Sequence, residues 1–157
     1  MQFVLLTGAD LGNRAETLRK AAELVSEHGC TILASSKMIE SAPWGFESET
    51  VFLNQALLIE TELPPTALLE MLIQIELTLG RTRNGQQWSS RTIDIDILCG
   101  EKLIHHSEQL VIPHPHLHER EFALAPLCQL VPNWKHPLLG KSYAELLNEV
   151  KTRSATV

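Results

Sequence analysis

The sequence predicts an α+β fold in which short strands alternate with two long helices before a helical C-terminal end. Three observations support this class: short apolar or β-branched runs, two segments with an apolar helical stripe, and turn residues between them. The predicted order is strand, helix, strand, strand, helix, strand, and then helices. This is the order of a ferredoxin-like split β-α-β sandwich with an antiparallel sheet and a C-terminal helical extension.

Composition favours one ordinary globular domain over residues 1–157. Hydrophobic residues make up 44% of the chain and charged residues 20%. The net charge of −6 argues against broad binding to nucleic acid. The three cysteines are widely separated and lack a Cys-x-x-Cys spacing, so reduced thiols are expected rather than zinc ligands or disulfides.

The first half of the chain contains a predicted strand at 3–6, a helix at 14–28 and a strand at 30–40. A loop rich in glycine and Asx residues precedes the helix, with Asn13 as its predicted N-cap and Gly29 as its end. The loop at 41–47 holds proline, glycine and two large aromatic residues, which is unusual for a simple connection.

A third strand is predicted at 52–61, where Phe52 and Asn54 share one face by the two-residue period of a strand. An aromatic ring and an amide are suited to a flat heteroaromatic ligand, because one can stack on it and the other can read its edge. The residues alone favour a structural interpretation over this one, with Phe52 in the core and Asn54 as a cap at the end of the sheet.

The second helix is predicted at 66–79, opened by Pro64 and Pro65 and closed by Gly80. Glu76 lies near its apolar stripe, where it could hold an arginine of the following loop or face solvent. That loop, residues 81–91, is long enough to be a functional lid.

The chain is organised around the strand predicted at 92–98, which contains Asp94 and Asp96. Two residues apart on a strand, the carboxylates share a face, while Ile93, Ile95 and Ile97 fill the other. Such a pair requires positive charge nearby, supplied either by Mg²⁺ or by arginines in a structural ion cluster. The spacing leaves both possibilities open.

The C-terminal third is predicted to begin with a short pairing segment at 103–104, with His105 and His106 facing solvent. Alternating histidines at 114, 116 and 118 suggest a metal site, but neighbouring prolines and the lack of cysteine partners make zinc a weak hypothesis. Helices are predicted at 122–130 and from a cap at Ser142 to Val150, followed by a frayed tail at 151–157.

Several motifs together resemble the 6-hydroxymethyl-7,8-dihydropterin pyrophosphokinase family of folate biosynthesis. The strongest is Arg-Thr-Ile-Asp-Ile-Asp-Ile-Leu at 91–98 with Trp88 before it. Gly-Ala-Asp-Leu-Gly at 8–12 resembles the family's Gly-Ser-Asn-Leu-Gly, and Val-Ile-Pro-His at 111–114 is followed by Arg-x-Phe at 120–122. The departures are Ala9, Asp10, Gln87 and the Ser89-Ser90 pair.

The resemblance implies an enzyme that moves pyrophosphate from ATP to a pterin alcohol and uses two Mg²⁺ ions. It implies catalytic roles for Arg81, Arg91, Asp94 and Asp96, with both aspartates as metal ligands. It implies pterin contacts from Ala42, Pro43, Trp44, Phe52, Asn54, Trp88 and Phe122. It implies ATP contacts from Glu76, Arg83, Trp88, Arg91, Ile97, His114 and Arg120.

Two other functions stay open: a binding module that has lost catalysis, and a Mg²⁺-dependent phosphohydrolase. The binding module is disfavoured because the chain retains the carboxylates Asp94 and Asp96 together with Arg81 and Arg91. The phosphohydrolase is disfavoured because no base is placed to activate water. We expect small-molecule substrates only, without nucleic acid or membrane partners, and a cytoplasmic monomer. The longest apolar run is too short for a membrane span, and no secretory signal is evident at the first residues.

Overall fold

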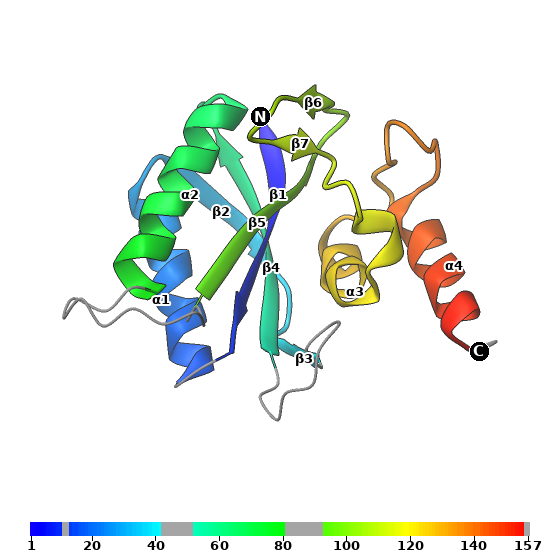
Figure 1. Cartoon of the computed structure of the whole chain (residues 1–157), viewed down its shortest axis with the longest axis horizontal. Coiled ribbons are helices and arrows are strands. Elements are labelled where there is room, and N and C mark those ends of the chain that lie inside the picture. Colours follow the sequence, from blue (N-terminus) through cyan, green and yellow to red (C-terminus); the bar gives the residue numbers. More distant parts are fainter. Residues whose placement is uncertain (11–12, 42–51, 81–92, 156–157) are drawn as a thin grey trace.

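The computed structural model describes residues 1–10, 13–41, 52–80 and 93–155. Its main sheet contains β1 (Gln2–Ala9), β2 (Cys30–Ser35), β3 (Ile39–Ser41), β4 (Phe52–Thr61) and β5 (Ile93–Gly100). The strand order is β2-β4-β1-β5, with β3 beside β4, and every pair is antiparallel. Helix α1 (Arg14–Glu27) joins β1 to β2, yet β4 lies between them. This split β-α-β arrangement confirms the predicted fold class (Figure 1).

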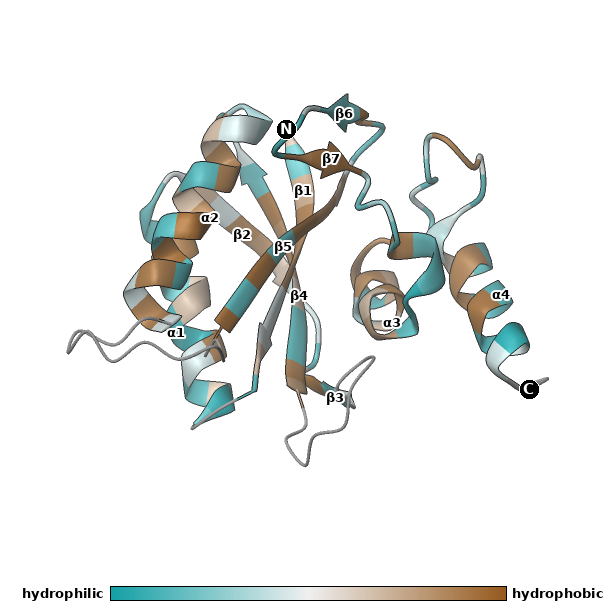
Figure 2. Cartoon of the chain, in the orientation of Figure 1, coloured by the Kyte–Doolittle hydropathy of each residue, from teal (hydrophilic) through white to brown (hydrophobic). Residues whose placement is uncertain are grey.

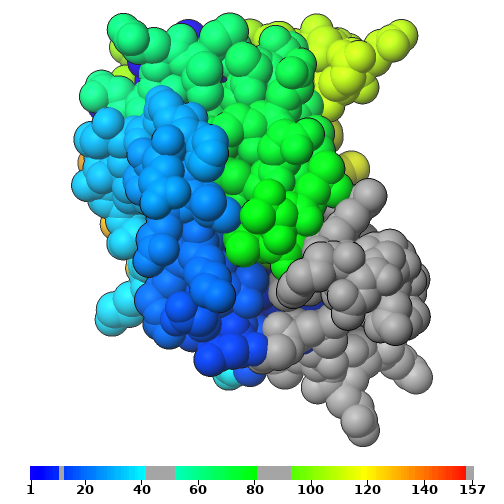
Figure 3. All heavy atoms as spheres, turned by 90° about the vertical axis from the view of Figure 1, so that its left-hand side faces the viewer, coloured from blue at the N-terminus to red at the C-terminus, as the bar shows by residue number. Residues whose placement is uncertain are grey.

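Helices cover both faces of the sheet (Figure 1). Helix α1 and helix α2 (Pro65–Gly80) lie on one face, side by side in Figure 3. The short helix η1 (Leu117–Glu119), α3 (Glu121–Leu130) and α4 (Tyr143–Ala155) lie on the other. Two separate cores result, and Figure 2 shows apolar residues along β5, α2 and α3.

The alternation predicted for β5 is confirmed. Ile93, Ile95 and Ile97 are buried against the α1 and α2 side. Asp94 is half-buried and Asp96 is exposed, and both point toward the α3 side of the sheet. The two acids therefore avoid the apolar core, although they belong to a strand that is otherwise buried.

The predicted helix caps are also confirmed. Asn13 Oδ1 accepts a hydrogen bond from the Glu16 N–H at 3.3 Å, and Gly29 follows α1 with a φ of +95°. At α4 the Ser142 hydroxyl accepts from the Glu145 N–H at 3.1 Å, while the Glu145 carboxylate accepts from the Ser142 N–H at 3.0 Å. This reciprocal pair is a capping box.

The single strand predicted at 30–40 is wrong, because the structure has β2 and β3 separated by residues 36–38. The cause is Ser36, which is buried and bonds to β4 outside a regular ladder. Its Oγ accepts from the Ala56 N–H at 2.8 Å, and its own N–H donates to the Ala56 carbonyl at 2.9 Å. The chain turns there, so β3 can pair further along β4, next to Asn54.

The short pairing segment predicted at 103–104 lies two residues too early. Strand β5 continues to Gly100, a turn with Lys102 at a φ of +56° follows, and β6 (His105–His106) pairs with β7 (Val111–Ile112). His106 is exposed as predicted. His105 is half-buried with its Nε2 atom enclosed, so its predicted solvent-facing position is wrong.

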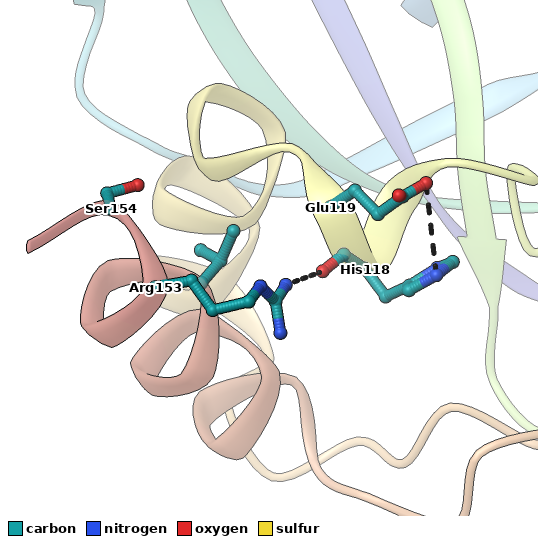
Figure 4. A pocket seen from close by; sticks show the side chains of 5 residues that line it. His118, Glu119, Arg153 and Ser154 are labelled. Atoms are coloured by element: carbon teal, nitrogen blue, oxygen red, sulfur yellow. Dashed lines mark hydrogen bonds and ion pairs between the residues drawn. The ribbon is translucent and has the colours of Figure 1, made fainter. Parts of the chain in front are cut away.

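The frayed tail predicted from Lys151 is also wrong, because α4 continues to Ala155. Arg153 secures this last part of the helix by donating from Nη2 to the His118 carbonyl oxygen at 3.4 Å (Figure 4). Within the described residues, no helix is both long enough and apolar enough to span a membrane.

Candidate functional site

The candidate site is built on a row of three residues across three neighbouring strands. Gly8 on β1 pairs with Asn54 of β4 on one side and with Asp94 of β5 on the other. Paired residues point to the same face of a sheet, so the amide and the carboxylate stand on either side of a position that has no side chain. Gly8 therefore leaves the position between the amide and the carboxylate without a side chain.

Asn54 is held in place from the outside of this row. It is 5% exposed, and its Nδ2 donates to the Ser41 hydroxyl of β3 at 2.6 Å. Its Oδ1 lies against Gly8, because a β-carbon placed on Gly8 would stand 2.9 Å from that oxygen. A buried amide with one end fixed by a neighbour can present the other end to a ligand.

A cavity of about 310 Å³ brings Asn54 together with Phe122 of α3. Phe122 is half-buried and adds an aromatic wall beside the amide. Phe52 lies two residues before Asn54 on the same face of β4 and is also half-buried. The structure thus brings Asn54 and Phe122 to one cavity and leaves Phe52 outside the group that lines it.

A third carboxylate lies close to the acid pair. Asp10 follows β1 directly, two residues beyond Gly8, and its Oδ1 is buried without a hydrogen-bond partner among the described residues. Burial raises the pKa of Asp10, and the nearby Asp94 raises it further. Together with Ala9, this residue departs from the expected Gly-Ser-Asn-Leu-Gly motif.

A second cavity, also of about 310 Å³, opens along the outer edge of β5. It brings together Asp96, Ile97 and His114, all of which were predicted site residues. The His114 N–H donates to the Leu98 carbonyl oxygen at 2.8 Å, so the chain after β7 is attached to the same strand. Among the described residues, no side chain lines both cavities.

His114 is neutral at physiological pH. Its burial, followed by the nearby positive charge of Arg120, lowers the pKa of His114 to about 4. Nδ1 accepts the His116 N–H at 3.3 Å, which places the proton of the neutral ring on Nε2. The ring can therefore donate a hydrogen bond from Nε2 to a ligand oxygen.

Arg120 lies between His114 and the aromatic wall. Its guanidinium carbon is 5.6 Å from the centre of the Phe122 ring, a cation–π distance. Arg120 precedes α3 directly, so one short segment positions both side chains.

Glu76 takes a role that sequence reasoning did not foresee. Its carboxylate accepts the Ile95 N–H at 2.7 Å, which attaches α2 to the strand that carries the two aspartates. Glu76 is not among the described residues that line either cavity. Neither this bond nor the position of Gly8 could be read from the sequence, since both depend on the pairing of strands and helices.

Seven predicted site residues lie outside the described residues: Ala42, Pro43, Trp44, Arg81, Arg83, Trp88 and Arg91.

The oxygen ligands of Asp94 and Asp96 fit Mg²⁺, which commonly uses one or two carboxylates together with substrate phosphates. No group of three or more potential ligands converges within the described ranges. The pair is therefore suited to share a cation with a polyphosphate, rather than to enclose a cation with protein ligands alone.

A third hollow, of about 520 Å³, lies between η1 and α4 and contains none of the predicted site residues (Figure 4). It is lined by His118, Glu119, Val150, Arg153 and Ser154. Glu119 accepts from His116 at 3.1 Å and lies within 4.0 Å of His118, so the polar groups here already pair with one another.

The chain is similar to known proteins both in sequence and in fold. The 7,8-dihydro-6-hydroxymethylpterin-pyrophosphokinase (HPPK) family profile matches residues 4–132. The chain is 43% identical over 124 residues to the 2-amino-4-hydroxy-6-hydroxymethyldihydropteridine pyrophosphokinase of Bacillus subtilis, covering 78% of this chain and 74% of that protein. It is 40% identical over 127 residues to the Methylorubrum extorquens protein of the same name, covering 80% of each.

Among solved structures, the fold resembles Plasmodium falciparum HPPK-DHPS with a TM-score of 0.76 at 16% identity. The match covers 97% of this chain and 45% of that one, so the chain spans less than half of the larger protein. At this identity the likeness concerns the fold alone.

Proposed function

The chain belongs to the 7,8-dihydro-6-hydroxymethylpterin-pyrophosphokinase family, and from this membership we propose its reaction. It transfers the pyrophosphoryl group of ATP to the hydroxymethyl group of 6-hydroxymethyl-7,8-dihydropterin, giving AMP and the pterin diphosphate of folate biosynthesis. The observation that carries this proposal is the row Asn54, Gly8 and Asp94, which sets an amide and a carboxylate on either side of a position without a side chain.

The pterin occupies the cavity beside Asn54. Its ring system is flat and aromatic and has donors and acceptors along one edge. Asn54 Oδ1 accepts from a ring-edge N–H, and Phe122 stacks on one face. Phe52 contributes to the opposite side, as the family resemblance implies, together with Ala42, Pro43, Trp44 and Trp88.

ATP occupies the cavity along the outer edge of β5. Ile97 offers an apolar surface to the nucleotide, and the Nε2–H of His114 donates to a phosphate oxygen. Arg120 adds positive charge on the same side. The resemblance adds Arg83, Arg91 and Trp88 to this group, and it assigns Glu76 there as well.

The reaction is an in-line displacement at the β-phosphorus of ATP. The pterin hydroxymethyl oxygen forms a bond to that phosphorus, the bond to the oxygen bridging the α- and β-phosphates breaks so that AMP leaves, and the hydroxyl proton is released to water. Asp94 and Asp96 would hold two Mg²⁺ ions, which would neutralise phosphate charge and polarise the reacting oxygens. Arg81 and Arg91 stabilise the negative charge that develops in the transition state.

Residues 1–157 act as one domain in this proposal, as a cytoplasmic monomer without nucleic acid or membrane partners. Size-exclusion chromatography with light scattering tests the monomer at working enzyme concentration.

The reaction itself is tested by incubating the protein with Mg·ATP, with and without the pterin alcohol, and separating the nucleotides. AMP that forms only with the pterin supports the proposal. ADP and phosphate would point to a phosphohydrolase instead. No turnover together with pterin binding, measured by fluorescence, would indicate a binding module that has lost catalysis.

A further inference from the structure

The outer edge of β5 is the basis of a further inference. This strand ends the sheet order β2-β4-β1-β5, so its outer edge pairs with no strand of the described chain. The outward backbone groups of such an edge need partners from elsewhere in the protein or from water. Two residues supply partners at separate points, leaving a gap between them.

Glu76 supplies the first partner, from the last turns of α2. Its Oε2 accepts the Ile95 N–H at 2.7 Å, a distance typical of a hydrogen bond strengthened by charge. Glu76 is half-buried, which limits competition from water. The backbone N–H of His114 supplies the second partner, at the Leu98 carbonyl oxygen.

The position of this bond matters because Ile95 lies between the two aspartates. A peptide unit fixed at Ile95 fixes the direction in which the backbone presents the side chains immediately before and after it. Ile95 also lines the outer-edge cavity, together with Asp96. The Glu76 carboxylate bonds to the backbone rather than to either aspartate in this contact.

We propose that Glu76 is a positioning residue for the metal-binding aspartates, which acts by fixing the Ile95 backbone so that both carboxylates converge on the same cations. This inference rests on the proposed function and replaces the direct ATP contact expected from the sequence. The role requires a hydrogen-bond acceptor at this place and not a negative charge.

Two variants separate the acceptor from the charge. Glu76→Gln keeps a carbonyl oxygen that can accept the Ile95 N–H but removes the charge, and Glu76→Ala removes both. Glu70→Ala is the matched control, because Glu70 is an exposed carboxylate on the same helix.

The first readout is Mn²⁺ binding, followed by electron paramagnetic resonance in the presence of a non-hydrolysable ATP analogue. Loss of an outer residue that orients metal ligands typically costs 10- to 100-fold in metal affinity, so Glu76→Ala should weaken Mn²⁺ binding by at least about 10-fold. The Mn²⁺ affinity of Glu76→Gln should stay within about 3-fold of that of the unchanged protein. The Mn²⁺ affinity of Glu70→Ala should equal that of the unchanged protein.

The second readout is the Ile95 amide itself, followed by hydrogen exchange in NMR spectra. Protection should persist in Glu76→Gln and be lost in Glu76→Ala. If Glu76→Gln weakens Mn²⁺ binding as strongly as Glu76→Ala while keeping the protection, charge rather than position is required and the inference is overturned. Unchanged Mn²⁺ binding in Glu76→Ala would overturn it as well.

These measurements do not depend on turnover. If the unchanged protein makes no AMP, the proposed reaction fails, yet the Mn²⁺ and exchange data still decide whether Glu76 positions the aspartates. If AMP forms, Glu76→Ala should lower kcat by about the same factor as Mn²⁺ affinity, with a smaller change in the KM for the pterin.

Discussion

The Oδ1 atom of Asn54 lies 2.9 Å from the point at which a β-carbon on Gly8 would stand. Contact this close with a nearly buried amide leaves no room for even the smallest side chain. The glycine is thus required by the space between two strands and not by an unusual backbone angle. On its other side Gly8 pairs with Asp94, so the amide and the carboxylate face the same side of the sheet with no side chain between them.

The first prediction concerns this glycine. Gly8→Ala should push Asn54 away from its place in the cavity proposed for the pterin, so pterin affinity should fall by about 10-fold or more, an effect of about 1.4 kcal/mol. ATP affinity should change much less, because the outer-edge cavity does not include Gly8. Fluorescence titration with the pterin and calorimetry with an ATP analogue measure the two affinities.

Gly140→Ala is the contrasting control for this variant. Gly140 has a φ of +72° and nothing within 4 Å of its added β-carbon, so alanine there costs backbone strain alone, about 1 kcal/mol. Its unfolding midpoint should drop while pterin binding is retained. Equal pterin affinity in Gly8→Ala and the unchanged protein would rule out the cavity beside Asn54 as the pterin site.

The second prediction concerns the acid pair. Asp96→Ala should abolish Mg²⁺-dependent turnover with little loss of fold stability, because Asp96 is exposed and its removal relieves repulsion with Asp94. Nucleotide chromatography and urea unfolding measure the two effects. Glu108→Gln is the control, since Glu108 is an exposed carboxylate lining the same cavity. Full activity of Asp96→Ala would remove the metal assignment.

The third prediction is a pH dependence of stability. His114 has a pKa of about 4 in the folded protein, below its ordinary value of 6.5, so the unfolded chain takes up this proton first as the pH falls. The contribution of neutral His114 to the free energy of unfolding is therefore complete above about pH 6.5 and is lost progressively toward pH 4.

Urea unfolding between pH 7.5 and pH 4 measures this contribution. His114→Gln has no proton to take up at this position. As the pH falls, the free energy of unfolding of the unchanged protein should therefore decrease more than that of the variant. His106→Gln, at an exposed histidine of β6, is the control for removing one histidine. A difference that stays constant over this range would contradict the prediction.

The fourth prediction concerns the second core. Tyr143 begins α4 and is fully buried, and its hydroxyl lies beside the Cys99 thiol, which offers only a weak hydrogen bond. Burial of this group raises the pKa of Tyr143. Because a buried hydroxyl without a strong partner is unfavourable, Tyr143→Phe should leave the free energy of unfolding unchanged or raise it by up to about 1 kcal/mol.

Tyr143→Leu is the companion variant, since it removes the ring that fills the space under α4. It should lower the free energy of unfolding by about 3 kcal/mol. A comparable loss in Tyr143→Phe would mean that the hydroxyl has a partner that stabilises the folded chain.

The sequence predicts those features that depend on local periodicity. The alternation of isoleucines and aspartates along β5, the Asn13 cap of α1 and the Ser142 cap of α4 all arise within a few residues. These rules are fixed by strand and helix geometry, whatever the rest of the chain does.

Contacts between distant segments are beyond such rules. The break between β2 and β3 comes from Ser36 bonding to Ala56 on another strand, and Glu76 reaches Ile95 across 19 positions. The need for glycine at position 8 arises because Asn54 and Asp94 are its two cross-strand neighbours in the sheet. The two cavities also form where distant strands and helices meet, so neither could be predicted from periodicity alone.

The most direct test of the proposed reaction follows the β-phosphorus of ATP. The protein is incubated with Mg·ATP labelled with ³²P at the β-position, together with 6-hydroxymethyl-7,8-dihydropterin, and the products are separated. Transfer of the pyrophosphoryl group places the label in the pterin product and leaves AMP unlabelled. Label retained in ADP would mean that only the terminal phosphate moves, and label released as free pyrophosphate would mean that water is the acceptor; either result would contradict the proposal.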